Sequence, residues 1–299
     1  MTKYRGRIAP SPTGFLHIGH AMTFWRAQER ARAAGGTLIL RIEDVDEDRC
    51  RTEFTTALMQ DLRWFGIEWQ EGPDNSGPFA PYLQSERHSC YLEAWRTLRA
   101  AGFIYPCSCS RKDVVAASLA PHEENDEPIY PGTCRPPGFC AGAGMSAADK
   151  QVVQATRLPL QASGATHWRF RIPDGEQIEF FDQHLGKQSA VAGRDFGDFI
   201  VWRRDNLPAY QLTVVVDDAA MQISEVVRGE DLLVSTFRQL LLYRALGLLP
   251  PKFFHAPLLL DESGKRLAKR HGSLSLRTLR ECGIRPEELR ALCSCSRSR

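Results

Sequence analysis

The sequence lacks any run of about 18 apolar residues, so we expect no membrane-spanning helix. Its N-terminus, residues 1–7, also lacks the apolar stretch of a signal peptide, and we therefore expect a cytoplasmic protein. Excess charge is missing too, since 38 basic and 36 acidic residues leave a formal net charge of +2. This balance argues against nonspecific electrostatic binding as the main task, but a local basic stripe for RNA is compatible with it.

The 299-residue chain has nine cysteines, an odd number that favours reduced thiols or a metal site over a disulfide framework. Prolines, glycines and cysteines cluster over residues 107–149, which we interpret as a small insertion held together by a metal. Three cysteines there are candidate zinc ligands: Cys107, Cys109 and Cys134. A tetrahedral zinc site needs a fourth ligand. His122 is the ordinary chemical choice and Cys140 is another candidate, whereas Cys293 and Cys295 have no assigned partners.

Hydrophobic periodicity predicts an α/β fold with a doubly wound parallel sheet. A short strand ends at residues 7–10, a helical pattern follows and closes at Gly35-Gly36, and residues 37–42 form a second strand. Strand, turn, helix and strand in this order are the βαβ unit of such a sheet. We expect further helices at 53–65, 85–101 and 235–246, and further strands at 198–202, 211–216 and 225–229.

Residues 10–20 read Pro-Ser-Pro-Thr-Gly-Phe-Leu-His-Ile-Gly-His and join the first strand to the first helix. A helix N-terminus offers unpaired N–H groups and a positive dipole end to phosphate. His17 and His20 are three residues apart and so share a helical face, while Gly14 and Gly19 let a ligand approach the backbone. This turn therefore predicts binding of nucleotide phosphates.

The same string resembles the signature of class I aminoacyl-tRNA synthetases, in the form used by glutamyl enzymes. Glutaminyl enzymes are expected to carry Pro-Pro-Glu-Pro-Asn-Gly in place of residues 9–14. The resemblance runs over about residues 5–272 and implies a Rossmann-like catalytic domain that activates L-glutamate with ATP and Mg²⁺. It implies that Pro10, His17, Gly19 and His20 bind ATP, with the two histidines catalytic.

Residues 264–272 resemble the family's mobile Lys-Met-Ser-Lys-Ser loop. Lys269 stands at the position of the family's catalytic lysine. The resemblance implies that it binds ATP and neutralises charge on the α-phosphate and the departing pyrophosphate. The loop departs from the family pattern at three positions: Arg266, Ala268 and Arg270.

A glutamate pocket needs a cation for the side-chain carboxylate and an anion for the α-ammonium group. Arg7 precedes the phosphate turn and can offer two N–H groups to a carboxylate. Glu43 follows a strand, at the edge where this fold binds ligands, and suits the ammonium group. The resemblance adds four further pocket residues: Ala9, Ser11, Tyr210 and Arg228.

Some glutamyl-type enzymes use a tyrosine that precedes the last cysteine as a zinc ligand, which would be Tyr130 here. The resemblance thus implies one structural zinc ion on Cys107, Cys109, Tyr130 and Cys134. It also divides the chain into two halves of the catalytic domain, 1–105 and 196–247, separated by an insertion, 106–195, with the zinc-binding subdomain and an acceptor-binding-like region. Residues 248–299 hold the mobile loop and a helical C-terminal part.

The sequence ends 29 residues after Arg270, and a domain usually needs about 50, so we expect no anticodon-binding domain. Residues 207–218 resemble most the truncated paralogues of glutamyl-tRNA synthetase that attach glutamate to queuosine in the tRNA(Asp) anticodon. The expected partners are therefore ATP, L-glutamate and queuosine-modified tRNA(Asp), bound by a monomer. Alternatives are a truncated synthetase that charges tRNA(Glu) and a non-catalytic paralogue that binds tRNA or an adenylate.

Overall fold

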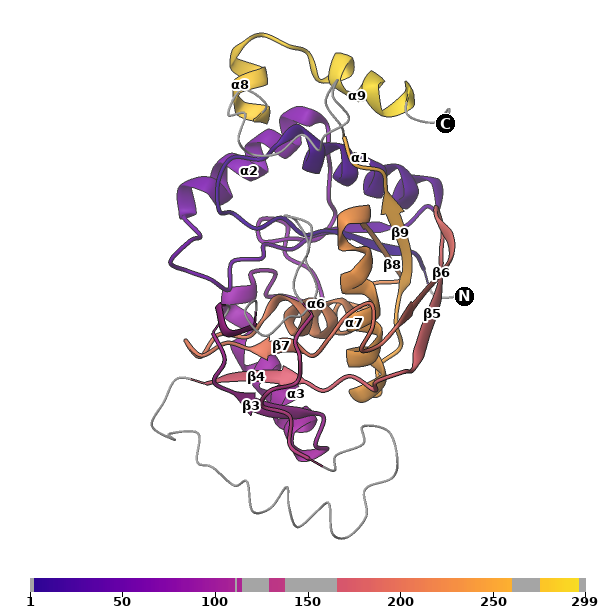
Figure 1. The fold of residues 1–299 in the computed structure, drawn as a ribbon. Coiled ribbons are helices and arrows are strands. Elements are labelled where there is room, and N and C mark those ends of the chain that lie inside the picture. The colour runs from indigo at the N-terminus through magenta and orange to yellow at the C-terminus, as the bar shows by residue number, and fades with distance from the viewer. Residues whose placement is uncertain (1–2, 111, 115–128, 138–165, 260–274, 296–299) are drawn as a thin grey trace.

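A computed structural model gives the fold of the chain and describes residues 3–110, 112–114, 129–137, 166–259 and 275–295 (Figure 1). Several predicted features lie outside these described residues. They are the loop lysine Lys269 with its neighbours Arg266, Ala268 and Arg270, and the two metal-ligand candidates His122 and Cys140.

Parallel strands form the centre of the fold. They are β1 (Arg5–Ile8), β2 (Thr37–Leu40), β8 (Glu225–Gly229) and β9 (Lys252–Ala256). β1 pairs with β2 and β8 pairs with β9, both in parallel. The backbone N–H of Ser224 donates to the carbonyl of Arg5 at 2.9 Å, which places β8 beside β1 and makes the two pairs neighbours. The predicted parallel α/β sheet is thus confirmed.

An antiparallel hairpin extends this sheet at one edge. It consists of β5 (Gln177–Asp182) and β6 (Gly186–Val191), and β5 meets β9 where Asp182 pairs with Phe253. The hairpin and β9 were not predicted from the sequence. Their pairing brings the end of β5 beside a strand more than 70 residues later in the chain.

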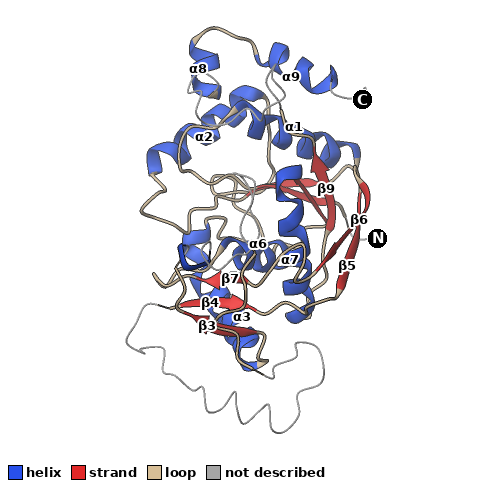
Figure 2. Ribbon diagram, viewed as in Figure 1, coloured by secondary structure: helices blue, strands red, loops and turns tan. Residues whose placement is uncertain are grey.

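Helices cover both faces of the parallel strands (Figure 2). On β2, Leu38 and Leu40 belong to one apolar core with α1 (Ile18–Ala33) and α2 (Thr52–Phe65). Ile39 between them belongs to a second core with α6 (Tyr210–Ala220) and α7 (Leu233–Ala245), after the 3-10 turn Glu230–Leu232. Because side chains alternate across a strand, this division puts α1 and α2 on one face and α6 and α7 on the other.

The predicted strand at 211–216 is wrong, since these residues belong to helix α6. Consecutive valines favour a strand in isolation. The helix is buried on most of its sides, so its apolar residues show no 3.6-residue pattern that would have distinguished it from a buried strand. As a helix, the segment carries Asp217 and Asp218 into the protein interior, where both are buried.

A smaller antiparallel sheet lies at the lower end in Figure 1. Its strands follow the order β3 (Ile104–Cys107), β4 (His167–Phe170) and β7 (Phe199–Trp202), and α3 (His88–Ala100), after the 3-10 turn Gln84–Arg87, precedes it in the chain. The predicted strand at 198–202 and the helices at 53–65, 85–101 and 235–246 are confirmed within a few residues.

Two helices close the described part of the chain, α8 (Leu276–Glu281) and α9 (Pro286–Cys295). Leu276, Leu279 and Leu289 join the apolar core of α1 and α2, and Arg290 Nη1 donates to the carbonyl of Phe65 at 2.9 Å. The predicted helical C-terminal part is therefore confirmed. Among the described residues, none of the helices combines the length and apolar character needed to cross a membrane.

Candidate active site

The phosphate turn leads directly into α1. His17 is the N-cap residue of this helix, and its Nδ1 accepts a hydrogen bond from the backbone N–H of Gly19 at 3.3 Å. A neutral ring whose Nδ1 accepts must carry its proton on Nε2. His20 lies one turn into the helix, is exposed and stacks with Phe24. Both predicted histidines thus stand at the positive end of the α1 dipole.

The space beside this helix end is open at the two glycines of the motif. Among the described residues, a Cβ atom at Gly14 would meet no atom within 4 Å, and one at Gly19 would meet only His17 Nδ1 at 3.7 Å. Packing within the described part of the chain therefore gives no reason for glycine at these positions. A ligand that approaches the backbone would be such a reason, as the sequence motif predicts.

The residues that follow the segment 260–274 return to the same turn. Ser275 forms a β-bridge with His17, and the backbone N–H of Leu276 donates to the carbonyl of Leu16 at 2.8 Å. The described chain thus resumes directly beside the phosphate turn, while the predicted catalytic Lys269 lies outside the described residues.

A buried ionic network lies where β1 and β2 end. The backbone N–H of Glu43 donates to the carbonyl of Pro10 at 3.0 Å, which joins the two predicted motifs. Arg41 is fully buried and contacts Asp218 at 2.7 Å and Glu43 at 3.4 Å. Arg7 Nε lies 3.3 Å from the same oxygen of Asp218, so one carboxylate of α6 holds two guanidinium groups.

Burial and these arginines together shift the pKa values of Glu43 and Asp218 in opposite directions. Burial raises the pKa of Glu43, and the charges of Arg41 and Arg7 offset this only in part. Burial also acts on Asp218, but there Arg41 and Arg7 outweigh it and the pKa of Asp218 is lowered. Asp218 is therefore the firmly ionised member, while Glu43 is the carboxylate with the weaker counter-charge.

Arg228, on β8, is a buried cation held by neutral groups. Its Nη1 donates to Gln239 Oε1 at 2.8 Å, its Nη2 to Thr236 Oγ1 at 2.5 Å and its Nε to His255 Nε2 at 3.3 Å. It forms no ion pair with a carboxylate of the described residues, and burial lowers the pKa of Arg228. Tyr210 is a further hydrogen-bond partner of this guanidinium, which retains its charge for a bound anion.

Tyr210 completes this group from the first turn of α6. Tyr210 is 39% exposed. Desolvation of its hydroxyl raises the pKa of Tyr210, the charge of Arg228 opposes this rise, and the charge of Glu43 adds to it. The structure thus brings together four predicted residues: Arg7, Glu43, Tyr210 and Arg228. The remaining predicted positions belong to the phosphate turn, where Pro10 is buried, Ala9 half-buried and Ser11 exposed.

Sequence reasoning missed several polar residues of this site. Arg41 could have been found, because it is a charge beside the apolar run of β2. Asp218 was visible as one of two consecutive acids after three valines, but the strand assignment concealed its direction. The residues that contact Arg228 come from α7 and β9 and left no local signal in the sequence.

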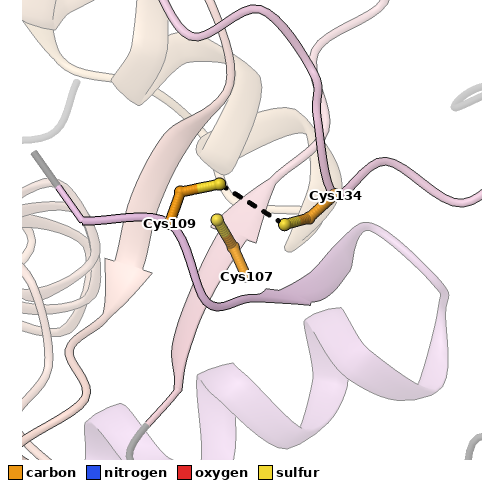
Figure 3. Close-up of side chains that lie close together, drawn as sticks. All are labelled: Cys107, Cys109 and Cys134. Atoms are coloured by element: carbon orange, nitrogen blue, oxygen red, sulfur yellow. Dashed lines mark hydrogen bonds between the residues drawn. The ribbon is translucent and has the colours of Figure 1, made fainter. Parts of the chain in front are cut away.

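Three predicted metal ligands meet at the end of β3. Figure 3 shows the side chains of Cys107, Cys109 and Cys134 turned toward one another. Their sulfur atoms all lie within 4.8 Å, and those of Cys109 and Cys134 are 3.5 Å apart. A tetrahedral site with bonds of about 2.3 Å places its sulfur atoms about 3.8 Å from each other, so this cluster can hold a metal ion.

Tyr130 lies against the same cluster. Its hydroxyl oxygen is 3.4 Å from Cys107 Sγ and 3.6 Å from Cys109 Sγ, and it accepts the backbone N–H of Cys134 at 2.8 Å. The sulfur–oxygen edge of a tetrahedral site is about 3.5 Å, which matches both distances. Burial raises the pKa of Cys134, but hydrogen bonds from Tyr130 and Ser108 outweigh it and lower that pKa to about 6, which favours the thiolate that metals bind.

The sequence and fold of the chain are similar to those of known proteins. Residues 3–295 match the family described as tRNA synthetases class I (E and Q), catalytic domain. The chain belongs to this family. The predicted resemblance is therefore confirmed, over nearly the whole length of the chain.

Named members of this synthetase family are similar to the chain over most of its length. It is 48% identical to the "Glutamyl-Q tRNA(Asp) synthetase" of Symbiobacterium thermophilum, an alignment that covers 94% of this chain and 83% of that protein. It is 42% identical to "Glutamate--tRNA ligase 2" of Syntrophus aciditrophicus, over 96% of this chain and 56% of the ligase.

The solved glutamate-tRNA synthetase of Elizabethkingia anophelis superimposes with a TM-score of 0.73 at 30% sequence identity. The match covers 91% of this chain and 54% of that one. The chain thus spans about half the length of this solved synthetase and of the Syntrophus ligase, but most of the length of the Symbiobacterium protein.

Proposed function

We propose that this synthetase activates L-glutamate with ATP and transfers the glutamate to the queuosine base in the anticodon of tRNA(Asp). The activation step rests on the environment of Arg228. This buried cation is held by neutral groups and lies close to Glu43. A cation without an ion pair among the described residues, beside the carboxylate of Glu43, complements an amino acid with an acidic side chain. The similarity to a protein named for tRNA(Asp) supports the second step.

In this proposal the pocket binds glutamate by its two charged ends. Glu43 accepts the α-ammonium group, and Arg228 with Tyr210 and Arg7 binds the side-chain carboxylate. Ala9 and Ser11 contribute backbone and hydroxyl contacts from the turn. Arg7 and Arg41 are already paired with buried carboxylates, whereas Arg228 forms no ion pair among the described residues, so the charge of the bound side chain would be matched mainly by Arg228.

The reaction then needs position and charge rather than a side-chain nucleophile. Pro10, His17, Gly19 and His20 hold the triphosphate at the N-terminus of α1, with Mg²⁺ bound to the nucleotide. The α-carboxylate of glutamate attacks the α-phosphorus, the bond to the bridging oxygen breaks, and pyrophosphate leaves. Lys269 neutralises the charge that develops there, and one such donor contributes about 2.7–4 kcal/mol to lowering the barrier.

We further propose a structural zinc ion on Cys107, Cys109, Cys134 and Tyr130. The matching edge lengths support this ligand set. In the same proposal, residues 1–105 and 196–247 form the catalytic domain, 106–195 the zinc-bearing insertion, and 248–299 the loop and the C-terminal helices.

Charging of tRNA(Glu) is the second candidate function, favoured by the 42% identity to a glutamate–tRNA ligase. Two assays separate the possibilities. Pyrophosphate exchange with each amino acid and no tRNA tests activation, and only glutamate should support it. Labelled glutamate is then offered to queuosine-containing tRNA(Asp), queuosine-free tRNA(Asp) and tRNA(Glu). Labelling confined to the first supports the proposal, whereas equal labelling of tRNA(Glu) contradicts it.

A further inference from the structure

Behind Arg228 lies a second buried pair that the proposed mechanism does not use. His255 on β9 and Asp182 at the end of β5 are both completely buried, and His255 Nδ1 is 2.6 Å from Asp182 Oδ2. On its other side, His255 Nε2 is 3.3 Å from Arg228 Nε and 2.9 Å from Thr236 Oγ1, a hydroxyl that can donate to it. The three side chains form a line from the hairpin edge of the sheet to the candidate pocket.

The donor and acceptor roles along this line follow from chemistry. An arginine Nε–H can only donate, so His255 Nε2 must be the acceptor. The neutral ring then carries its proton on Nδ1 and donates it to Asp182. The ring packs against both Phe180 and Phe253, with centroid distances of 6.1 and 6.3 Å, and this apolar contact disfavours a second proton on the imidazole.

We propose that Asp182 and His255 are positioning residues that fix the guanidinium of Arg228 for the side-chain carboxylate of the substrate. Asp182 selects the Nδ1–H tautomer, and that tautomer presents an acceptor to Arg228 Nε. Because this bond is to a neutral ring, Arg228 is oriented and its charge stays available to the substrate. The inference rests on the proposed function, since Arg228 acts there on the substrate's side chain.

An isosteric change separates this role from a purely structural one. Asp182 Oδ1 accepts the backbone N–H groups of His184 and Leu185, each at 2.9 Å, and these bonds hold the hairpin turn. Asp182→Asn keeps this oxygen, which is also 3.3 Å from the backbone N of His255, but places an amide N–H₂ against His255 Nδ1 and in place of the oxygen 3.1 Å from that backbone N. The ring would then shift its proton to Nε2, where it can donate to Thr236 Oγ1, and the Nε–H of Arg228 would lose its acceptor.

The test is pyrophosphate exchange with wild type, Asp182→Asn and a control, Ile178→Ala. Ile178 is buried on the same strand and makes no polar contact with Arg228, so its loss lowers stability alone. For Asp182→Asn we expect the KM for glutamate to rise by about 10–100-fold, the range found for partners that orient metal-bound histidines, with the KM for ATP within about twofold of wild type. In Ile178→Ala both KM values should stay close to wild type.

The outcomes are distinguishable. An unchanged KM for glutamate in Asp182→Asn, or an equal rise in Ile178→Ala, overturns the inference while the proposed function stands. Absence of glutamate-dependent exchange in the wild type overturns the proposed function and the inference with it. Should Asp182→Asn fail to fold, ¹⁵N NMR of the wild-type ring decides, with assignment from His255→Gln: a proton on Nδ1 supports the inference, and a proton on Nε2 overturns it.

Discussion

Replacing Arg41 by methionine tests the buried ionic network most directly. Arg41 contacts Asp218 at 2.7 Å and Glu43 at 3.4 Å and is completely buried. In the variant, Asp218 keeps Arg7 at 3.3 Å, whereas Glu43 loses the closest cation that the described residues offer it. Because removal of one partner leaves a buried charge uncompensated, we expect the free energy of unfolding at pH 7 to fall by about 3–5 kcal/mol.

The loss of unfolding free energy in this variant should depend on pH, in a direction that follows from the pKa of Glu43. Burial already raises the pKa of Glu43, and loss of Arg41 raises it further because that guanidinium favours the ionised form. Each additional pKa unit costs about 1.4 kcal/mol while the carboxylate is ionised. A carboxyl group with a raised pKa destabilises the fold above that pKa, and the penalty disappears as pH falls through it. The loss measured at pH 5 should therefore be smaller than the loss at pH 7.

Urea unfolding of wild type and Arg41→Met at both pH values measures these losses. Arg244→Met is the matched control, since Arg244 pairs with Glu176 at the surface and its removal should change stability by less than about 1 kcal/mol. A loss below about 1 kcal/mol for Arg41→Met at pH 7, or one that grows toward pH 5, would refute the reasoning.

Three further predictions concern the proposed sites. Gly19→Ala should raise the free energy of unfolding by about 0.5–1 kcal/mol, because alanine favours a helix and its methyl group would enter open space among the described residues. The same change should raise the KM for ATP, and an unchanged KM contradicts phosphate binding there. The KM for glutamate should rise as pH falls toward the raised pKa of Glu43, since the protonated group cannot pair with an ammonium ion, and Glu43→Gln should abolish this dependence in exchange assays. Cys134→Ser should leave less than half an equivalent of zinc by elemental analysis, and Tyr130→Phe should weaken zinc retention against a chelator; full retention in both contradicts the proposed ligand set.

The first βαβ unit and its motif could be predicted because every signal there is local. The turn at residues 10–20 and the strand at 37–42 need no distant contact to be recognised. Segment 211–216 failed for the opposite reason: burial on most sides removed the periodicity that marks a helix. Strand β9 was not predicted because its own sequence shows no clear alternation. It is a strand because it pairs with β8, which lies more than 20 residues earlier.

The same difference applies within the candidate pocket. Arg7 and Glu43 could be predicted because Arg7 lies directly before the phosphate turn and Glu43 follows a strand at the edge where parallel sheets bind ligands. His255 and Asp182 could not, because they lie 73 positions apart and meet only through the pairing of β5 with β9. The residues proposed to contact substrate at these two positions carry local signals, whereas those proposed to orient Arg228 depend on the tertiary fold.

The two arginines assigned to the substrate carboxylate differ in their counter-charges. Arg7 shares Asp218 with Arg41, so much of its charge is already neutralised before any ligand binds. Arg228 is held by a threonine, a glutamine and a neutral histidine, and its lowered pKa records the cost of keeping it desolvated. That cost is relieved by a bound carboxylate and not by a carboxamide, because only the carboxylate brings a negative charge. Discrimination between glutamate and glutamine should therefore depend mainly on Arg228, with Arg7 contributing to position more than to charge.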